Sequence, residues 1–216
     1  MSGLTAVALV VVILERWLFT AFATTDQVRV TSLFTALPPW APAGWLLHLA
    51  LVVLCFAAGH ARATAPWPAG QVVRPVVTFL VAWGGGLVVL LANGFSRDAV
   101  LQILDAALGP LTCLIPYLPL WAVPYLAGLA WGRGRPGPEL LPPGSRLVVL
   151  INRFALPLFL WHPTALVLAA LATARLGPIA GLNDSPTGPL WLLARLAWLP
   201  VLATVLIGLV ALARRR

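Results

Sequence analysis

The sequence of 216 residues contains no lysine and few charged side chains of any kind. Charged residues make up 9% of the chain, whereas about 25% is usual in a soluble domain, and hydrophobic residues make up 61%. So few charges cannot cover the surface of a globular domain in water. The composition therefore excludes an ordinary soluble protein and predicts an integral membrane protein.

All 14 cationic side chains are arginine, against six acidic ones, which gives a formal net charge of +8. In a soluble protein such a basic balance would suggest a nucleic-acid partner. In a membrane protein, arginines instead flank the spanning helices and set their orientation. We therefore expect the lipid bilayer as partner and no nucleic acid.

Cysteine is scarce, and the motifs of soluble enzymes are missing. Cys55 and Cys113 both fall inside apolar runs, and no second thiol lies at ligand spacing, so neither a disulfide nor a metal site is expected. No P-loop, GxSxG, HExxH or GxGxxG sequence occurs. The sequence thus predicts no metal and no bound cofactor.

Six apolar runs are long enough for a bilayer, which needs about 20 mostly apolar residues per helix. They predict an all-α, polytopic bundle of six membrane-spanning helices that forms a single membrane domain over residues 1–216. We expect Gly84, Gly85 and Gly86 to break the third run, and the four prolines of the fourth to kink it. The runs cover about 4–23, 44–63, 72–91, 108–131, 147–176 and 190–213.

The arginines are distributed unevenly among the loops. Most follow the second and fourth runs or end the chain, and loops that face the cytoplasm carry such an excess. The bias predicts that both termini lie in the cytoplasm and that the protein is a multi-pass protein of the inner or plasma membrane. The arginines concerned are Arg62, Arg74, Arg133, Arg135, Arg146, Arg214, Arg215 and Arg216.

Three ionisable residues fall deep inside apolar runs: Glu15, Arg16 and His162. With ~1.5 Å of rise per residue, Glu15 lies ~16 Å into its helix and His162 ~22 Å into its own, so they can meet near the bilayer centre. A histidine beside a carboxylate can act as a general base. The alternative is a polar cluster that only holds helices together.

Arg153 lies near the cytoplasmic end of the same apolar run as His162. It is either a contact for an anion such as phosphate, or a side chain that reaches out to the lipid headgroups.

Several stretches resemble the acyltransferase-3 family of integral membrane acyltransferases, in particular its arginine- and alanine-rich bacterial members. They follow one another along the chain in the same order as in the family. Residues 152–166 (NRFALPLFLWHPTAL) are similar to the family's late helix, which typically reads Asn, Ala and Tyr-Leu-Trp-His. Residues 109–117 (GPLTCLIPY) resemble its Gly-Pro-Leu-Trp helix, and Arg74-Pro75 and residues 193–198 (LARLAW) resemble two helix entries.

The resemblance implies transfer of an acyl group from a cytoplasmic donor, such as acyl-CoA, to a hydroxyl of an envelope glycan or similar acceptor. His162 and Glu15 are then the candidate catalytic residues. The substrate-binding candidates are Arg16, Asn152, Arg153 and Arg74.

The chain departs from the family in two ways. Arg16 stands where the family has a helix-one histidine, and an arginine cannot serve as a base. About four middle helices are also missing. The chain is therefore interpreted as a truncated or degenerate member. The alternatives are a non-catalytic membrane partner, in an oligomer or with another subunit, and a small transporter or channel subunit.

Overall fold

The computed structural model describes residues 3–23, 29–32, 43–64, 69–114, 118–133, 145–186 and 188–214. Within these residues the chain forms eight α-helices, one short 3-10 helix and a two-stranded sheet. The elements are α1 (Gly3–Phe19), β1 (Thr20–Ala23), β2 (Arg29–Ser32), α3 (Ala43–Thr64), α4 (Ala69–Ala92), α5 (Arg97–Leu114), α6 (Leu118–Gly132), α7 (Arg146–Arg153), α8 (Ala155–Thr173), η1 (Ala174–Leu176) and α9 (Pro189–Arg214).

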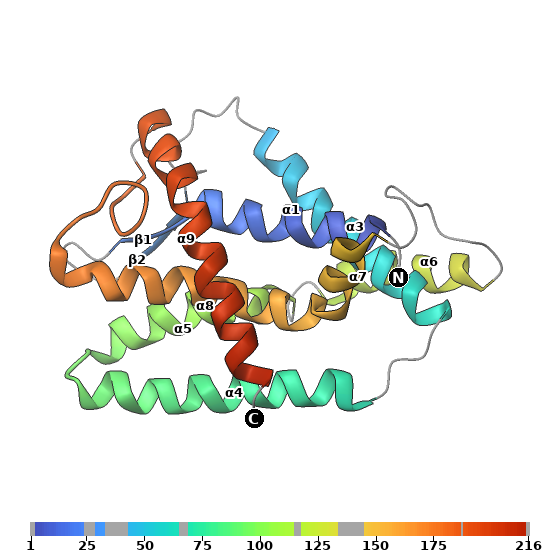
Figure 1. Cartoon of the computed structure of the whole chain (residues 1–216), viewed down its shortest axis with the longest axis horizontal. Helices are drawn as coiled ribbons and strands as arrows, with labels where there is room; N and C mark the ends of the chain where they lie inside the picture. Colours follow the sequence, from blue (N-terminus) through green and yellow to red (C-terminus); the bar gives the residue numbers. More distant parts are fainter. Residues whose placement is uncertain are drawn as a thin grey trace.

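Helix α8 lies at the centre of the molecule. In Figure 1, α1 and α4 run alongside α8 in the same direction, α5 runs in the opposite direction, and α9 crosses over the group. One cluster of buried apolar side chains joins these five helices, among them Leu9, Phe79, Ile103, Leu160 and Leu202. The sequence position of α8 does not indicate this central role, since six of the described α-helices precede it.

Within the described parts of the chain, three helices are long and apolar enough to cross a membrane: Gly70–Ala92, Ala155–Leu176 and Pro189–Arg214. In the apolar stretch of the α8 segment, 56% of the residues are buried inside the molecule. The corresponding share is only 11% for α4 and 17% for α9. Large apolar side chains therefore cover the outer faces of α4 and α9, among them Val81 and Ile207 at 67% and 66% exposure. Such outer faces are typical of helices in lipid.

The connection between α4 and α5 is a sharp turn that the sequence encodes locally. Gly94, with φ of 82°, follows α4, and the N–H groups of Gly94 and Phe95 donate to the Leu91 and Leu90 carbonyls at 3.1 and 3.2 Å. This is the glycine-dependent end of a helix. Ser96 then caps α5, because its hydroxyl accepts the Ala99 N–H at 3.2 Å.

The structure of α4, α5 and α6 corrects two of our expectations. Helix α4 continues through Gly84–86, and nothing lies within 4 Å of a Cβ added at any of the three glycines. The predicted helix 108–131 is instead two helices, α5 and α6, and α5 starts at Arg97, in what we expected to be a loop. The side chains of Pro110, Cys113, Pro116 and Pro119 lie outside the described residues.

The predicted helix 147–176 is also two α-helices, with a break at Phe154. Phe154 has φ −108° and ψ 11° and joins α7 to α8. Pro157 follows three residues later, where its ring would clash with the carbonyl of residue 153 in a continuous helix. Because a proline in the first turn of a helix costs nothing, the chain begins a new helix at Ala155 instead.

Helix α1 ends earlier than we expected. The run 4–23 is helical only to Phe19 and then becomes β1, which pairs antiparallel with β2, Thr20 opposite Ser32 and Ala23 opposite Arg29. The structure is thus mostly helical but not all-α. The hairpin satisfies backbone groups that the end of a helix would leave without partners.

Helices α3 and α6 pack through glycines at backbone contact. A Cβ added to Gly59 would meet the Tyr125 carbonyl, and one added to Gly128 would meet the Phe56 carbonyl. A Cβ on Gly132 would lie 2.8 Å from that of Ala63. Gly128 and Gly132 form a GxxxG pair, which lets membrane helices approach closely. The contacts advance together along both chains, so the two helices are parallel.

This packing predicts opposite behaviour for two glycines. Gly128→Ala should lower the free energy of unfolding by about 1–3 kcal/mol, since the added methyl has no room. Gly85→Ala, the matched control in open space on α4, should raise it by about 0.5–1 kcal/mol, because alanine favours a helix over glycine. Unfolding of both variants in detergent micelles by titration with a denaturing detergent measures the difference. Equal stability of the two variants would contradict the contact.

Candidate functional site

The centre of α8 holds the candidate site, and a proline organises it. Pro163 has no N–H, so the Phe159 carbonyl one turn earlier loses its helical donor. The His162 ring replaces that donor, with Nδ1 at 2.7 Å from the Phe159 oxygen. Since a carbonyl can only accept, Nδ1 carries the hydrogen. In the neutral ring, Nε2 is then the basic nitrogen.

His162 is completely buried, and its Nε2 has no hydrogen-bond partner among the described residues. The residues around it in the helix, from Leu160 to Val167, are all buried as well. A buried nitrogen without a partner is costly, because it loses its hydrogen bond to water. Such an atom is therefore a candidate contact for a substrate, a water or a proton.

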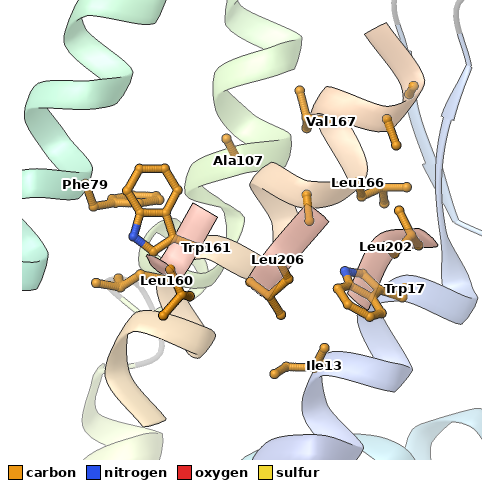
Figure 2. Close-up of a cluster of buried hydrophobic side chains, with 14 of the residues drawn as sticks. Ile13, Trp17, Phe79, Ala107, Leu160, Trp161, Leu166, Val167, Leu202 and Leu206 are labelled. Atoms are coloured by element: carbon orange, nitrogen blue, oxygen red, sulfur yellow. The ribbon is translucent and has the colours of Figure 1, made fainter. Parts of the chain in front are cut away.

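Two tryptophans hold α8 on either side of this histidine. The indole N–H of Trp17, on α1, donates to the His162 carbonyl at 2.8 Å. The indole N–H of Trp83, on α4, donates to the Thr164 hydroxyl at 3.0 Å. Figure 2 shows the apolar packing beside them, where Trp161 meets Phe79 edge to face with ring centroids 5.2 Å apart. The two bonds fix α8 against α1 and α4.

The charged residues of α1 lie at the level of His162, as their helical rise predicts. Arg16 precedes Trp17, whose indole N–H donates to the His162 carbonyl. Glu15 is buried at 6% exposure and makes polar interactions of its own, as Arg16 does. Arg16 therefore neighbours the residue that contacts His162, and roles for Arg16 and Glu15 at the ring stay predictions.

The other predicted substrate-binding residues lie away from His162. Asn152 is buried at the end of α7, ten residues earlier in the chain. Arg153 is exposed, with Cζ 6.0 Å from the Phe154 ring centroid, and Arg74 is exposed on α4. These three residues belong to the end of the molecule where α8 begins, not to its centre.

Sequence reasoning missed Arg195, the largest fully buried side chain among the described residues. One terminal nitrogen donates to the Gly181 carbonyl at 2.7 Å and the other to the Thr20 carbonyl, while Cζ lies 5.1 Å from the Trp191 ring centroid. Arg195 therefore ties α9 to the α8–α9 loop and to β1. Its position inside the last apolar run was the signal, since a charge there needs internal partners.

The loop that Arg195 holds is itself ordered by side-chain bonds. The Asn183 amide accepts the Ile179 N–H and donates to the Gly177 carbonyl, and Asn183 is fully buried. Gly181 has φ of 74°, and a Cβ there would lie 2.5 Å from the backbone nitrogen of Arg195. Only glycine therefore fits where the loop touches α9.

Among the described residues, no three His, Cys, Asp or Glu side chains gather as metal ligands do. Cys55 is a free thiol within α3. No protein-family model, curated protein or solved structure matches the chain. The chemistry of the site must therefore be argued from its own residues.

The role of Pro163 can be tested by histidine tautomers. In the wild type, ¹⁵N NMR in lipid should show the His162 ring with its hydrogen on Nδ1. Pro163→Ala restores the backbone donor to the Phe159 carbonyl, so the ring should shift toward the tautomer with hydrogen on Nε2. His60 serves as the internal control and should not change. A wild-type ring protonated on Nε2 alone would contradict the assignment.

Proposed function

We propose that the chain is a multi-pass protein of the inner or plasma membrane with both termini in the cytoplasm. Support comes from three helices long and apolar enough to cross a bilayer and from the apolar outer faces of α4 and α9. The common direction of α1, α4 and α8, with α5 reversed, agrees with successive crossings (Figure 1). The arginine excess in every second loop supports the orientation.

We further propose that this protein is an acyltransferase in which His162 is the general base. The observation that carries the proposal is the buried Nε2, which is held as a hydrogen-bond acceptor because Nδ1 donates to the Phe159 carbonyl. The stretch that resembles the acyltransferase-3 family, residues 152–166, forms most of this central helix. The donor is a thioester such as acyl-CoA, and the acceptor is a hydroxyl of an envelope glycan or similar molecule.

In this mechanism Nε2 takes the proton of the acceptor hydroxyl as its oxygen attacks the thioester carbonyl. The new C–O bond forms, the C–S bond breaks, and the departing thiolate takes the proton back from the imidazolium. The Phe159 carbonyl holds the ring during both transfers. Arg16, next to Trp17 on α1, would stabilise the oxyanion of the intermediate.

A second function has its own supporting observation. His162 is 0% exposed, so a substrate reaches Nε2 only if a covering side chain moves. Burial of this kind suits a polar contact that fixes helices in place. On that account the chain is a non-catalytic membrane partner whose His162 and Trp17 stabilise the packing of α8. The loss of the helix-one histidine to Arg16 favours the same view.

Turnover of acyl-CoA by the purified protein in lipid nanodiscs tests the first function. His162→Gln keeps an amide donor for the Phe159 carbonyl but has no basic nitrogen, so turnover should fall by about 10²–10⁴-fold. Glu15→Gln tests the carboxylate in the same assay. Arg97→Gln, an exposed residue at the start of α5, is the matched control and should turn over like the wild type.

Two outcomes would decide against this proposal. A well-folded wild type that turns over none of several acyl-CoA donors would support the non-catalytic partner. Undiminished turnover by a well-folded His162→Gln variant would place the base elsewhere.

A further inference from the structure

Two arginines stack on one aromatic ring at the junction of α7 and α8. Arg153 Cζ lies 6.0 Å and Arg214 Cζ lies 4.6 Å from the centroid of the Phe154 ring. Arg153 ends α7 and Arg214 ends α9, so the ends of two helices and the start of α8 meet here. Contact with an aromatic ring restrains a guanidinium group that would otherwise be mobile.

Among the described residues, these two cations have no acidic counterpart. Both side chains are exposed, and neither forms an ion pair with a carboxylate within the part of the chain that the structure describes. Two more arginines, Arg215 and Arg216, follow in the sequence. Like charges held on one ring repel each other, and a bound anion removes that repulsion. Guanidinium groups pair with phosphate through two parallel hydrogen bonds.

The exposed face of α7 indicates how such an anion is presented. Arg146, Val149, Leu150 and Arg153 recur at the spacing of one helix face, and all four are exposed, Val149 at 59% and Leu150 at 53%. A face with apolar residues between cations is typical of a helix at the boundary between lipid headgroups and acyl chains. Such a face favours a phosphate that is attached to acyl chains.

We infer that Arg153, Arg214 and Phe154 form a binding site for the phosphate of an anionic phospholipid, whose acyl chains lie along Val149 and Leu150. The bound lipid joins the ends of α7 and α9 at the start of α8. This site is separate from His162, so its existence does not depend on the proposed acyl transfer.

Native mass spectrometry of the full chain, with phosphatidylglycerol and phosphatidylcholine offered at equal amounts, tests the site. The wild type should retain phosphatidylglycerol preferentially. Arg153→Gln/Arg214→Gln should reduce that preference on the order of 30-fold, about five-fold for each arginine near an anionic lipid. Arg153→Lys/Arg214→Lys keeps both charges and should retain most of the preference.

A matched control lies at the opposite end of the molecule. Arg97 and Arg175 are both exposed, at the start of α5 and in η1, far from α7 in Figure 1. Arg97→Gln/Arg175→Gln removes the same charge and should leave the preference within two-fold of the wild type. If the double glutamine variant at 153 and 214 does not fold, Arg214→Gln alone should show about a five-fold loss.

Three results would overturn the inference. The first is an unchanged preference for phosphatidylglycerol in a folded Arg153→Gln/Arg214→Gln variant. The second is an equal loss in the Arg97→Gln/Arg175→Gln control, which would show that net charge alone attracts the lipid. The third is displacement of the lipid by millimolar inorganic phosphate, which would identify a site for free phosphate instead.

Discussion

The hydrogen bond between His162 and the Phe159 carbonyl is the interaction on which the centre of this structure depends. Pro163 removes a backbone donor in the middle of an apolar helix, and an unsatisfied carbonyl there would cost several kcal/mol in lipid. The histidine satisfies that carbonyl from within the same helix. The backbone carbonyl of His162 in turn accepts the Trp17 indole N–H, and this second bond joins α8 to α1. One missing N–H thus accounts for the ring orientation of the candidate base.

Much of the fold follows from local sequence, and some of it required closer attention to local signals. The runs 44–63 and 190–213 predict α3 and α9 almost to the residue, although the second run contains the charged Arg195. Local signals also indicate where helices end and begin, at Gly94, Ser96 and Pro157. Hydropathy alone does not detect these boundaries. Hydropathy over spanning length therefore predicted fewer, longer helices than the chain forms, and three helices of the described residues meet the length and hydropathy of a span.

The candidate site shows where sequence reasoning ends. Helical rise placed α1 and His162 at one level, and Trp17 on α1 does bond the His162 carbonyl, although the helix of His162 starts at Ala155 and not at Leu147. The partners of Arg195 could not be found in this way, since Thr20 lies 175 residues away and the bond depends on how α9 crosses β1. Likewise, the sequence of α7 does not predict that Arg214 contacts the Phe154 ring together with Arg153.

The central claim is that α8 is the core of a helical membrane protein whose α4 and α9 face lipid. Spin labels at Val81→Cys and Ile207→Cys, with Cys55 and Cys113 replaced by serine, test it most directly in nanodiscs. Both labels should relax with lipid-soluble oxygen and not with a water-soluble nickel chelate, whereas a label at Ser185→Cys, in the exposed loop, should show the reverse. Strong relaxation of the Val81 and Ile207 labels by the nickel chelate would contradict the account.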